Sequence, residues 1–240
     1  MAIYKAKLTK VEEVAEGTMA FYFSRPSGFE FRPGQFIDIT LIDPSETDGE
    51  GNIRAFTIAS APFEDHLMVA TRMRDTAFKR VLRNSPMGLE VSVDGPNGSF
   101  TLHKNAARPA VFLAGGIGIT PFLSIVQQAT KQKLPHTMYL FYSNRRPEDS
   151  AFLDLLTELA AGDSNFHYIA TMTEMLKSLR QWTGETGFID QAMLLRNIPD
   201  LVGPIYYIAG PPAMVAAMRQ TLVTAGVDED DIRTEEFSGY

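Results

Sequence analysis

The chain has 240 residues, 45% of them hydrophobic and 21% charged, an ordinary composition for a soluble globular protein of one large or two smaller domains. Its formal net charge of −7 argues against a nucleic-acid-binding protein, because phosphate backbones are bound by basic surfaces. Cysteine is absent, which excludes disulfides, thiolate zinc sites and cysteine-held iron–sulfur clusters. The four histidines lack ligand-like spacing, so we expect no metal site.

Neither a membrane segment nor a secretory signal is expected. No stretch approaches the roughly 20 apolar residues that a membrane-spanning helix needs, and lysines interrupt the N-terminal sequence. The expected location is therefore cytoplasmic.

The first half of the chain predicts an antiparallel β-barrel. Residues 20–24, 36–41 and 66–71 alternate between apolar and polar side chains, with the period of two that half-buried strands show. Turns rich in glycine and proline separate the strands, at the spacing of an antiparallel barrel. One helix is expected near residues 76–84, and the acidic run 43–53 is expected to be a loop.

The second half predicts a doubly wound parallel α/β sheet of the Rossmann-like type. Apolar strands alternate with helical stretches, an order in which helices cover both faces of the sheet. The expected strands are residues 110–114, 137–142, 166–171 and 205–209, and the expected helices are residues 121–131, 149–161, 189–196 and 212–225. We therefore divide the chain into a barrel domain at residues 1–105 and an α/β domain at residues 106–240.

A glycine-rich turn after the first of these strands is the main nucleotide-binding signal. The strand runs into Gly115, Gly116 and Gly118, and a helix follows with Thr120 as the expected N-cap and Pro121 in its first turn. Glycines let the backbone approach a pyrophosphate, and the helix N-terminus supplies free N–H groups to bind it.

A second turn, Gly210-Pro211-Pro212 followed by Met214, has the same place after a later strand. Ligands of open α/β sheets bind at the carboxyl ends of strands, so both turns are expected to contact one nucleotide.

Five segments, taken in order, resemble the ferredoxin–NADP reductase superfamily over the chain from about residue 3 to the C-terminus. They are residues 33–36, 54–60, 95–100, 115–121 and 209–212. The resemblance implies a flavoprotein oxidoreductase with a FAD-binding barrel and an NAD(P)H-binding α/β domain. Such an enzyme transfers hydride from NADPH or NADH to FAD and passes electrons to a ferredoxin, flavodoxin or oxygenase-type acceptor.

The resemblance also implies roles for the motif Arg54-Ala55-Phe56-Thr57. Arg54 would bind a flavin phosphate, since a guanidinium fork matches phosphate oxygens. Phe56 would lie against the flavin ring, and Thr57 would offer its hydroxyl near the reactive nitrogen.

A second flavin contact is expected in the segment with Thr71, Arg72, Met73, Thr76 and Ala77. Backbone N–H groups near Thr76 and Ala77 would meet the FAD pyrophosphate, because Asp75 or Thr76 can cap the helix that starts there. The glycines that the family usually has here are missing, so FMN remains an alternative to FAD.

Coenzyme choice is expected to depend on Ser143, Arg145 and Arg146, which follow a strand at its carboxyl end. Two arginines beside a hydroxyl favour the 2′-phosphate of NADPH, and no acidic residue in this stretch is present to bind the ribose hydroxyls of NADH. The alternative is that both arginines are merely solvated.

The C-terminal sequence carries a further resemblance. In the family, a C-terminal Glu-x-aromatic sequence brings its carboxylate to the redox centre and lays its aromatic ring over the flavin. Glu235 and Phe237 match this pattern. Tyr240 is the other candidate for the stacked ring. Ala209 stands where the family usually has a cysteine near the nicotinamide. The missing thiol is expected to affect the rate of hydride transfer more than whether the reaction takes place.

Basic residues gather on and before the expected helix at 76–84: Arg72, Arg74, Lys79, Arg80 and Arg83. They would suit docking of an acidic electron carrier such as a ferredoxin or flavodoxin, although a solvated helix face is the alternative. Two other functions stay open: a flavin or quinone reductase with a small-molecule acceptor, and a non-catalytic FAD-binding electron-transfer subunit.

Overall fold

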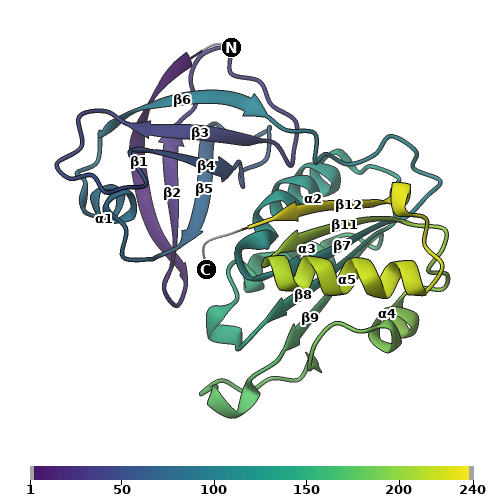
Figure 1. Cartoon of the computed structure of the whole chain (residues 1–240). Helices are drawn as coiled ribbons and strands as arrows, with labels where there is room; N and C mark the ends of the chain where they lie inside the picture. Colours follow the sequence, from purple (N-terminus) through teal and green to yellow (C-terminus); the bar gives the residue numbers. More distant parts are fainter. Residues whose placement is uncertain (1–2, 238–240) are drawn as a thin grey trace.

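The computed structural model describes residues 3–237. They form two six-stranded sheets, the first from the strands in residues 3–97 and the second from the strands in residues 110–236. Figure 1 shows the first sheet, an antiparallel barrel, beside the second, a parallel sheet flanked by helices. Both predicted architectures are confirmed. The connection between them is residues 98–109, and the predicted division between residues 105 and 106 falls there and stays a prediction.

The barrel has the strand order β4-β3-β6-β1-β2-β5. Its strands are β1 Ile3–Ala15, β2 Thr18–Ser24, β3 Phe36–Leu41, β4 Ile53–Thr57, β5 His66–Arg72 and β6 Glu90–Asn97. Alternation along β3 buries Ile37, Ile39 and Leu41, which pack in one cluster with Phe21 and Phe23 of β2. On β3 the predicted period of two therefore arises from one core-facing side, whereas β5 is buried on both sides, with Leu67 and Val69 in one apolar cluster and Met68 and Ala70 in another.

Helix α1 spans Ala77–Asn84 and is anchored to the barrel by its apolar side. Thr76 is the N-cap, and its side chain accepts a hydrogen bond from the Lys79 backbone N–H, as the sequence predicted. Phe78 and Leu82 are buried in the barrel core. The first turn of α1 is thereby held in a fixed place just beyond the end of β5.

The parallel sheet has the order β10-β9-β8-β7-β11-β12. Its strands are β7 Ala110–Gly115, β8 Met138–Asn144, β9 Phe166–Met172, β10 Glu185–Thr186, β11 Ile205–Gly210 and β12 Ile232–Glu236. Its helices are α2 Thr120–Gln132, α3 Leu153–Gly162, α4 Gln191–Asn197 and α5 Pro212–Thr224, with 3-10 turns η1 Gly116–Ile119, η2 Pro147–Asp149, η3 Met175–Lys177 and η4 Glu229–Asp231. Every residue of β7 and β11 is buried, because α2 and α3 pack with one apolar cluster of the sheet and α4 and α5 with another.

Three elements differ from the sequence prediction, and one of them is the two-residue edge strand β10, which was not predicted. Helix α3 begins at Leu153 rather than residue 149, because Phe152 adopts a left-handed φ of 60° that separates it from η2. Strand β12 was not predicted, since its sequence Ile-Arg-Thr-Glu-Glu is polar. It forms at the sheet edge by parallel pairing with β11, which aligns Ala209 with Glu235.

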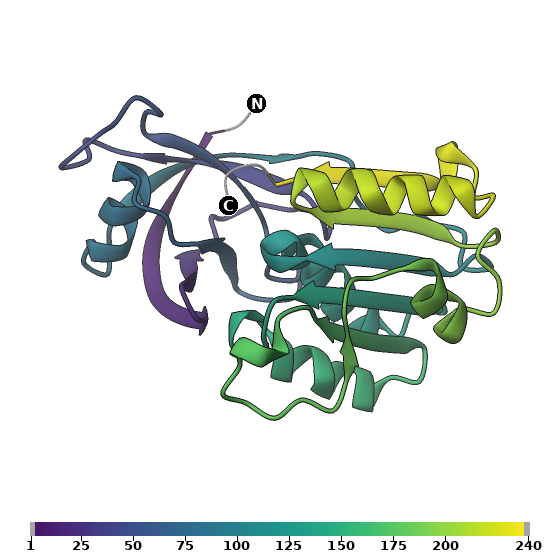
Figure 2. The same cartoon turned by 60° about the horizontal axis from the view of Figure 1, so that its bottom comes forward.

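The carboxyl ends of the parallel strands face the barrel. Figures 1 and 2 both show the arrowheads of this sheet pointing toward it. At the interface, the Ser124 hydroxyl of α2 donates to the Ser60 carbonyl at 2.7 Å. In the connection, the backbone N–H of buried His103 donates to the Tyr207 hydroxyl at 2.8 Å. The ligand-binding edge of the α/β domain therefore lies at the junction of the two domains.

Within residues 3–237, no helix combines the length and the apolar character needed to cross a membrane.

The close approach of η1 to β11 is testable through Gly118. A Cβ at this position would lie 2.2 Å from the Ala209 carbonyl oxygen, so Gly118→Ala should destabilise the protein by about 1–3 kcal/mol through overpacking. Gly162→Ala is the matched control, because nothing lies within 4 Å of its new methyl group. Thermal unfolding measures both, and equal melting temperatures would contradict the packing described.

Candidate functional site

A pocket of about 580 Å³ borders the carboxyl ends of four parallel strands. The residues contributed by β7, β8, β9 and β11 and the turns after them include Gly115, Gly116, Ser143, Arg145, Thr173, Glu174, Pro211 and Met214. Arg72, from the end of β5, adds a residue of the barrel to the same wall. Its size and its mixture of apolar wall with few polar groups are typical of cofactor sites.

Glycines let the turns after β7 and β11 interlock beneath this pocket. A Cβ on Gly115 would lie 2.3 Å from the Met214 sulfur, and the Cα of Gly115 lies close to Gly210. Gly116 differs, because it adopts a left-handed φ of 54° and no atom lies within 4 Å of where its Cβ would stand. A side chain at Gly115 would therefore clash with the turn after β11. Gly116 is needed for its left-handed backbone conformation, and the space beside its backbone is open.

Half of the predicted nucleotide-binding residues line the pocket: Gly115, Gly116, Ser143, Arg145, Pro211 and Met214. The other half lie around it: Gly118, Thr120, Pro121, Arg146, Gly210 and Pro212. One detail was wrong, because Thr120 is the first residue of α2 and not its N-cap. Its hydroxyl donates back to the Ile117 carbonyl at 3.1 Å.

Sequence reasoning missed several lining residues, above all Glu174. This residue follows the carboxyl end of β9, so the rule that selected Ser143 could have found it. A hydrogen bond from Lys177 at 2.7 Å lowers the pKa of its carboxyl group. Phe188 and Met218 also line the pocket, and no sequence signal marked them.

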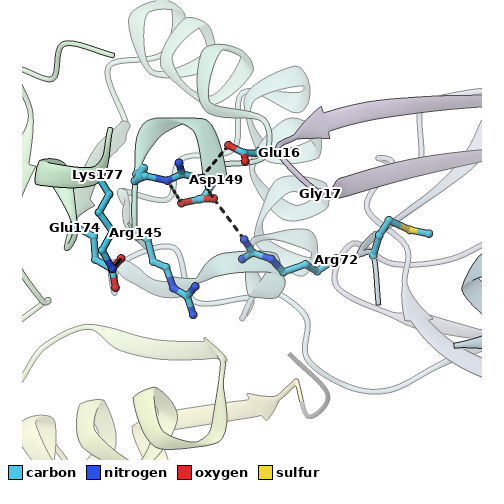
Figure 3. A pocket seen from close by; sticks show the side chains of 9 residues that line it. Glu16, Gly17, Arg72, Arg145, Asp149, Glu174 and Lys177 are labelled. Carbon is cyan, nitrogen blue, oxygen red and sulfur yellow. Dashed lines mark hydrogen bonds and ion pairs between the residues drawn. The ribbon is translucent and has the colours of Figure 1, made fainter. Parts of the chain in front are cut away.

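A second, smaller pocket of about 380 Å³ adjoins the first and shares Arg72, Arg145 and Glu174 with it. Figure 3 shows the Arg145 side chain pointing away from Asp149, while Arg72 reaches toward Asp149 from the barrel. Arg146 is engaged elsewhere: it binds Asp149 twice at 2.9 Å and Glu16 at 2.9 Å. Of the two predicted arginines, only Arg145 faces the larger pocket.

On the barrel, Arg54 and the N-terminus of α1 converge on one carboxylate. The backbone N–H of Ala77 donates to Asp48 Oδ2 at 2.7 Å, and the Arg54 guanidinium lies 3.9 Å from Asp48 Oδ1. Arg54 also binds Glu50 at 2.6 Å. The hydrogen bond from Ala77 is the main cause of the lowered pKa of Asp48. The predicted phosphate contacts therefore form an anion site that carboxylates of the loop before β4 occupy.

The remaining predicted flavin residues lie nearby. Phe56 is buried with its ring 5.8 Å from that of Phe78, and Thr57 is buried beside it at the end of β4. Ala55 is exposed on the other side of the strand. Thr71 is buried in β5.

The segment that follows β5 is bound to the barrel. The Met73 backbone N–H donates to the Gly17 carbonyl at 2.8 Å. Lys79 is half-buried and donates to the Arg72 carbonyl at 2.7 Å, and its pKa falls to about 8, chiefly through burial. Arg80 pairs with Glu46 and Asp75. The basic surface expected on α1 is therefore smaller than the sequence suggested, since Lys79 turns inward and Arg80 is neutralised.

The C-terminal strand brings two predicted residues to the domain junction. Glu235 lines a cleft of about 620 Å³ together with Phe100, from the connection, and Arg233. Burial raises the pKa of its carboxyl group to about 7. Phe237 is half-buried against the core, and its backbone N–H donates to the Gly210 carbonyl at 3.0 Å. Tyr240 lies outside the described residues.

A barrel with a candidate anion site, followed by a parallel sheet whose nucleotide-type pocket meets the barrel at Arg72, defines a two-domain dinucleotide-binding oxidoreductase. Comparison with known proteins agrees: the family described as oxidoreductase NAD-binding domain matches residues 112–220. A crystal structure of a ferredoxin NADP+ reductase from Neisseria gonorrhoeae with bound FAD and NADP is similar over 98% of this chain and 99% of that one, with 25% identity and a TM-score of 0.79.

Curated relatives agree as well. The 2-halobenzoate 1,2-dioxygenase electron transfer component of Burkholderia cepacia is 30% identical over 97% of this chain and 67% of its own length. The propane 2-monooxygenase reductase component of Rhodococcus jostii (strain RHA1) is 26% identical over 98% of this chain and 63% of its own length. The chain thus spans about two thirds of these relatives or slightly less. It belongs to the ferredoxin reductase family of FAD- and NAD(P)-dependent oxidoreductases.

The raised pKa of Glu235 links stability to pH. Because this carboxyl group holds its proton more tightly in the folded state, its contribution to stability is fully present below about pH 4.5 and is lost as the pH rises toward 7. Glu235→Gln should therefore gain stability over the parent as the pH rises from acidic to slightly alkaline. Urea unfolding across that range measures the difference, with the exposed neighbour in Glu236→Gln as control. A difference that does not change with pH would contradict the burial of this carboxyl group.

Proposed function

We propose that this chain is a cytoplasmic reductase that takes hydride from NAD(P)H onto bound FAD and passes the electrons to a separate oxygenase component or to an acidic carrier such as a ferredoxin. The observation that carries the proposal is the position of Arg72, a barrel residue in the wall of the pocket at the carboxyl ends of the parallel strands, which supports a coenzyme site at the barrel. The names of the oxygenase reductase relatives support the choice of acceptor.

The pocket at the carboxyl ends of the parallel strands fits a dinucleotide coenzyme. Its volume of about 580 Å³ lies in the usual range for cofactor sites. The open space beside the Gly116 backbone leaves room for a pyrophosphate at the turn after β7. Arg145 and Arg72 add positive charge to its wall.

The barrel fits a flavin phosphate. Asp48 stands in for a phosphate oxyanion, since it receives the Ala77 N–H and faces Arg54. The low pKa of Lys79, due to burial and then to Arg74 and Arg54, shows that cations are crowded here, as expected where an anionic ligand binds. FAD is preferred to FMN because Arg54 and the start of α1 together offer a guanidinium and backbone N–H groups for the two phosphates of a pyrophosphate.

A bound flavin supplies the acceptance of hydride and the release of electrons to the acceptor. The residues of this chain would supply alignment: the turns after β7 and β11 would hold the coenzyme, and the buried Thr57 would offer its hydroxyl to the flavin. Burial raises the pKa of Glu235 to about 7, so its carboxyl group can take up and release a proton at the junction near neutral pH. Phe237, half-buried at the junction, would cover a bound flavin ring and would have to move aside to admit the nicotinamide. Ala209 supplies no thiol, and none is required.

The central experiment is anaerobic reduction of the purified protein. After reconstitution with FAD, one equivalent of NADH or NADPH should bleach the flavin absorption band near 450 nm. A screen of ferredoxins and oxygenase components then identifies the acceptor by increased turnover. Protein that neither binds flavin nor is reduced would overturn the proposal, and turnover that no protein partner increases would favour a small-molecule acceptor.

Flavin affinity tests the anion site on the barrel. Arg54→Ala should weaken FAD binding by about 1.5–3 kcal/mol, because it removes a charge-assisted phosphate contact. Asp48→Asn should instead tighten binding, since it removes the carboxylate that competes for the Ala77 N–H. Asp43→Asn makes the same charge change elsewhere in the loop and serves as control. Equilibrium dialysis measures all three, and weaker binding by Asp48→Asn would contradict the competition.

Coenzyme preference tests the nucleotide pocket. Arg145→Ala should lower the ratio of kcat/KM for NADPH to that for NADH by about tenfold, because Arg145 would face the 2′-phosphate. Glu174→Gln should raise the ratio, since a carboxylate repels that phosphate and suits the free ribose hydroxyls of NADH. Arg146→Ala should leave the ratio unchanged, as Arg146 binds Asp149 and Glu16. An equal effect of Arg146→Ala and Arg145→Ala would disprove this assignment.

A further inference from the structure

Asp149 is a buried carboxylate at the domain junction that the reaction does not directly use. It is 7% exposed and ends the short turn η2, five residues after β8 ends. Arg146 donates to both of its oxygens at 2.9 Å. A buried carboxylate requires such pairing, because an uncompensated charge in the interior is strongly unfavourable.

The contact between Asp149 and Arg72 is longer than the contacts between Asp149 and Arg146. Arg72 ends β5 in the barrel, and its guanidinium approaches Asp149 Oδ1 at 3.5 Å, at the limit of hydrogen bonding. Figure 3 shows this contact crossing from the barrel to the α/β domain. Asp149 thus binds one arginine of its own domain tightly and one arginine of the other domain loosely.

The surroundings hold Asp149 in place against the barrel. The Glu16 backbone N–H, in the turn between β1 and β2, donates to the Glu148 carbonyl at 2.9 Å. Arg146 also binds the Glu16 carboxylate at 2.9 Å. Asp149 is therefore a fixed point, and the looser Arg72 is the part of this cluster that is able to move.

Arg72 lines both adjoining pockets, and it is the one barrel residue among the described residues that line the larger one. If its guanidinium turned toward a coenzyme phosphate, Asp149 would stay paired with Arg146 and no buried charge would be left alone. We propose that Asp149 is a positioning residue, which keeps the Arg72 guanidinium at the mouth of the nucleotide pocket for the coenzyme phosphate. The proposal rests on the proposed function.

A double-mutant cycle on the FAD-loaded protein tests this role. Arg72→Ala should raise the KM for the preferred coenzyme by about tenfold or more, through loss of a charge-assisted contact, with flavin content unchanged. Asp149→Asn should raise KM by about threefold to tenfold and change kcat by less than twofold, because Arg72 remains but is no longer held in place. In the Arg72→Ala background, Asp149→Asn should have no further effect on KM, whereas a merely structural role would add its effect in both backgrounds.

Asp154→Asn is the control, since it makes the same charge change at an exposed position of α3. If Asp149→Asn does not fold, Asp149→Glu replaces it in the cycle, because it keeps the charge and moves the carboxylate by one methylene. Equal effects of the substitution in both backgrounds, or an unchanged KM in Arg72→Ala, would overturn the proposal. Reduction of the parent protein by NAD(P)H is measured first, so that failure of the proposed function is seen separately.

Discussion

The close packing of β7 against β11 is the constraint on which the site depends. These central strands are buried on both faces, and the turns that leave them are so close that a Cβ on Gly118 would meet the Ala209 carbonyl at 2.2 Å. From β7 the sheet extends one way through β8 and β9, and from β11 the other way to β12. The pocket of about 580 Å³ lies at the carboxyl ends of β7, β8, β9 and β11, next to these closely packed turns.

Charge is distributed unevenly around that pocket. The chain has a net charge of −7, yet arginines from both domains meet at the junction. Several of the arginines are paired with carboxylates: Arg72 and Arg146 with Asp149 at the junction, and Arg54 with Asp48 and Glu50 on the barrel. Such internal pairs keep the cations in place until an anionic ligand takes over part of their pairing.

Several residues show the limits of reading chemistry from neighbouring sequence. Arg145 and Arg146 are adjacent, but successive side chains at the end of a strand diverge, so one lines the pocket and the other binds Asp149. Arg72 was predicted as a flavin contact, and its place in the nucleotide pocket depends on the fit of the barrel against the other domain. Glu174 was missed although it follows the carboxyl end of β9, the neighbour of β8, so that the rule that selected Ser143 applies to it as well.

The sequence by itself determined the two architectures, the glycine turns after β7 and β11 and the capped start of α1, because these follow from local periodicity and backbone preference. Tertiary structure alone decided which charged side chains meet. The edge strand β12 forms only because β11 offers a partner, which brings Glu235 to the junction. Likewise, Asp48 reaches Ala77, and Asp149 reaches Arg72, only after segments distant in sequence have packed together. Such pairings depend on distances between elements, and no local pattern of residues encodes those distances.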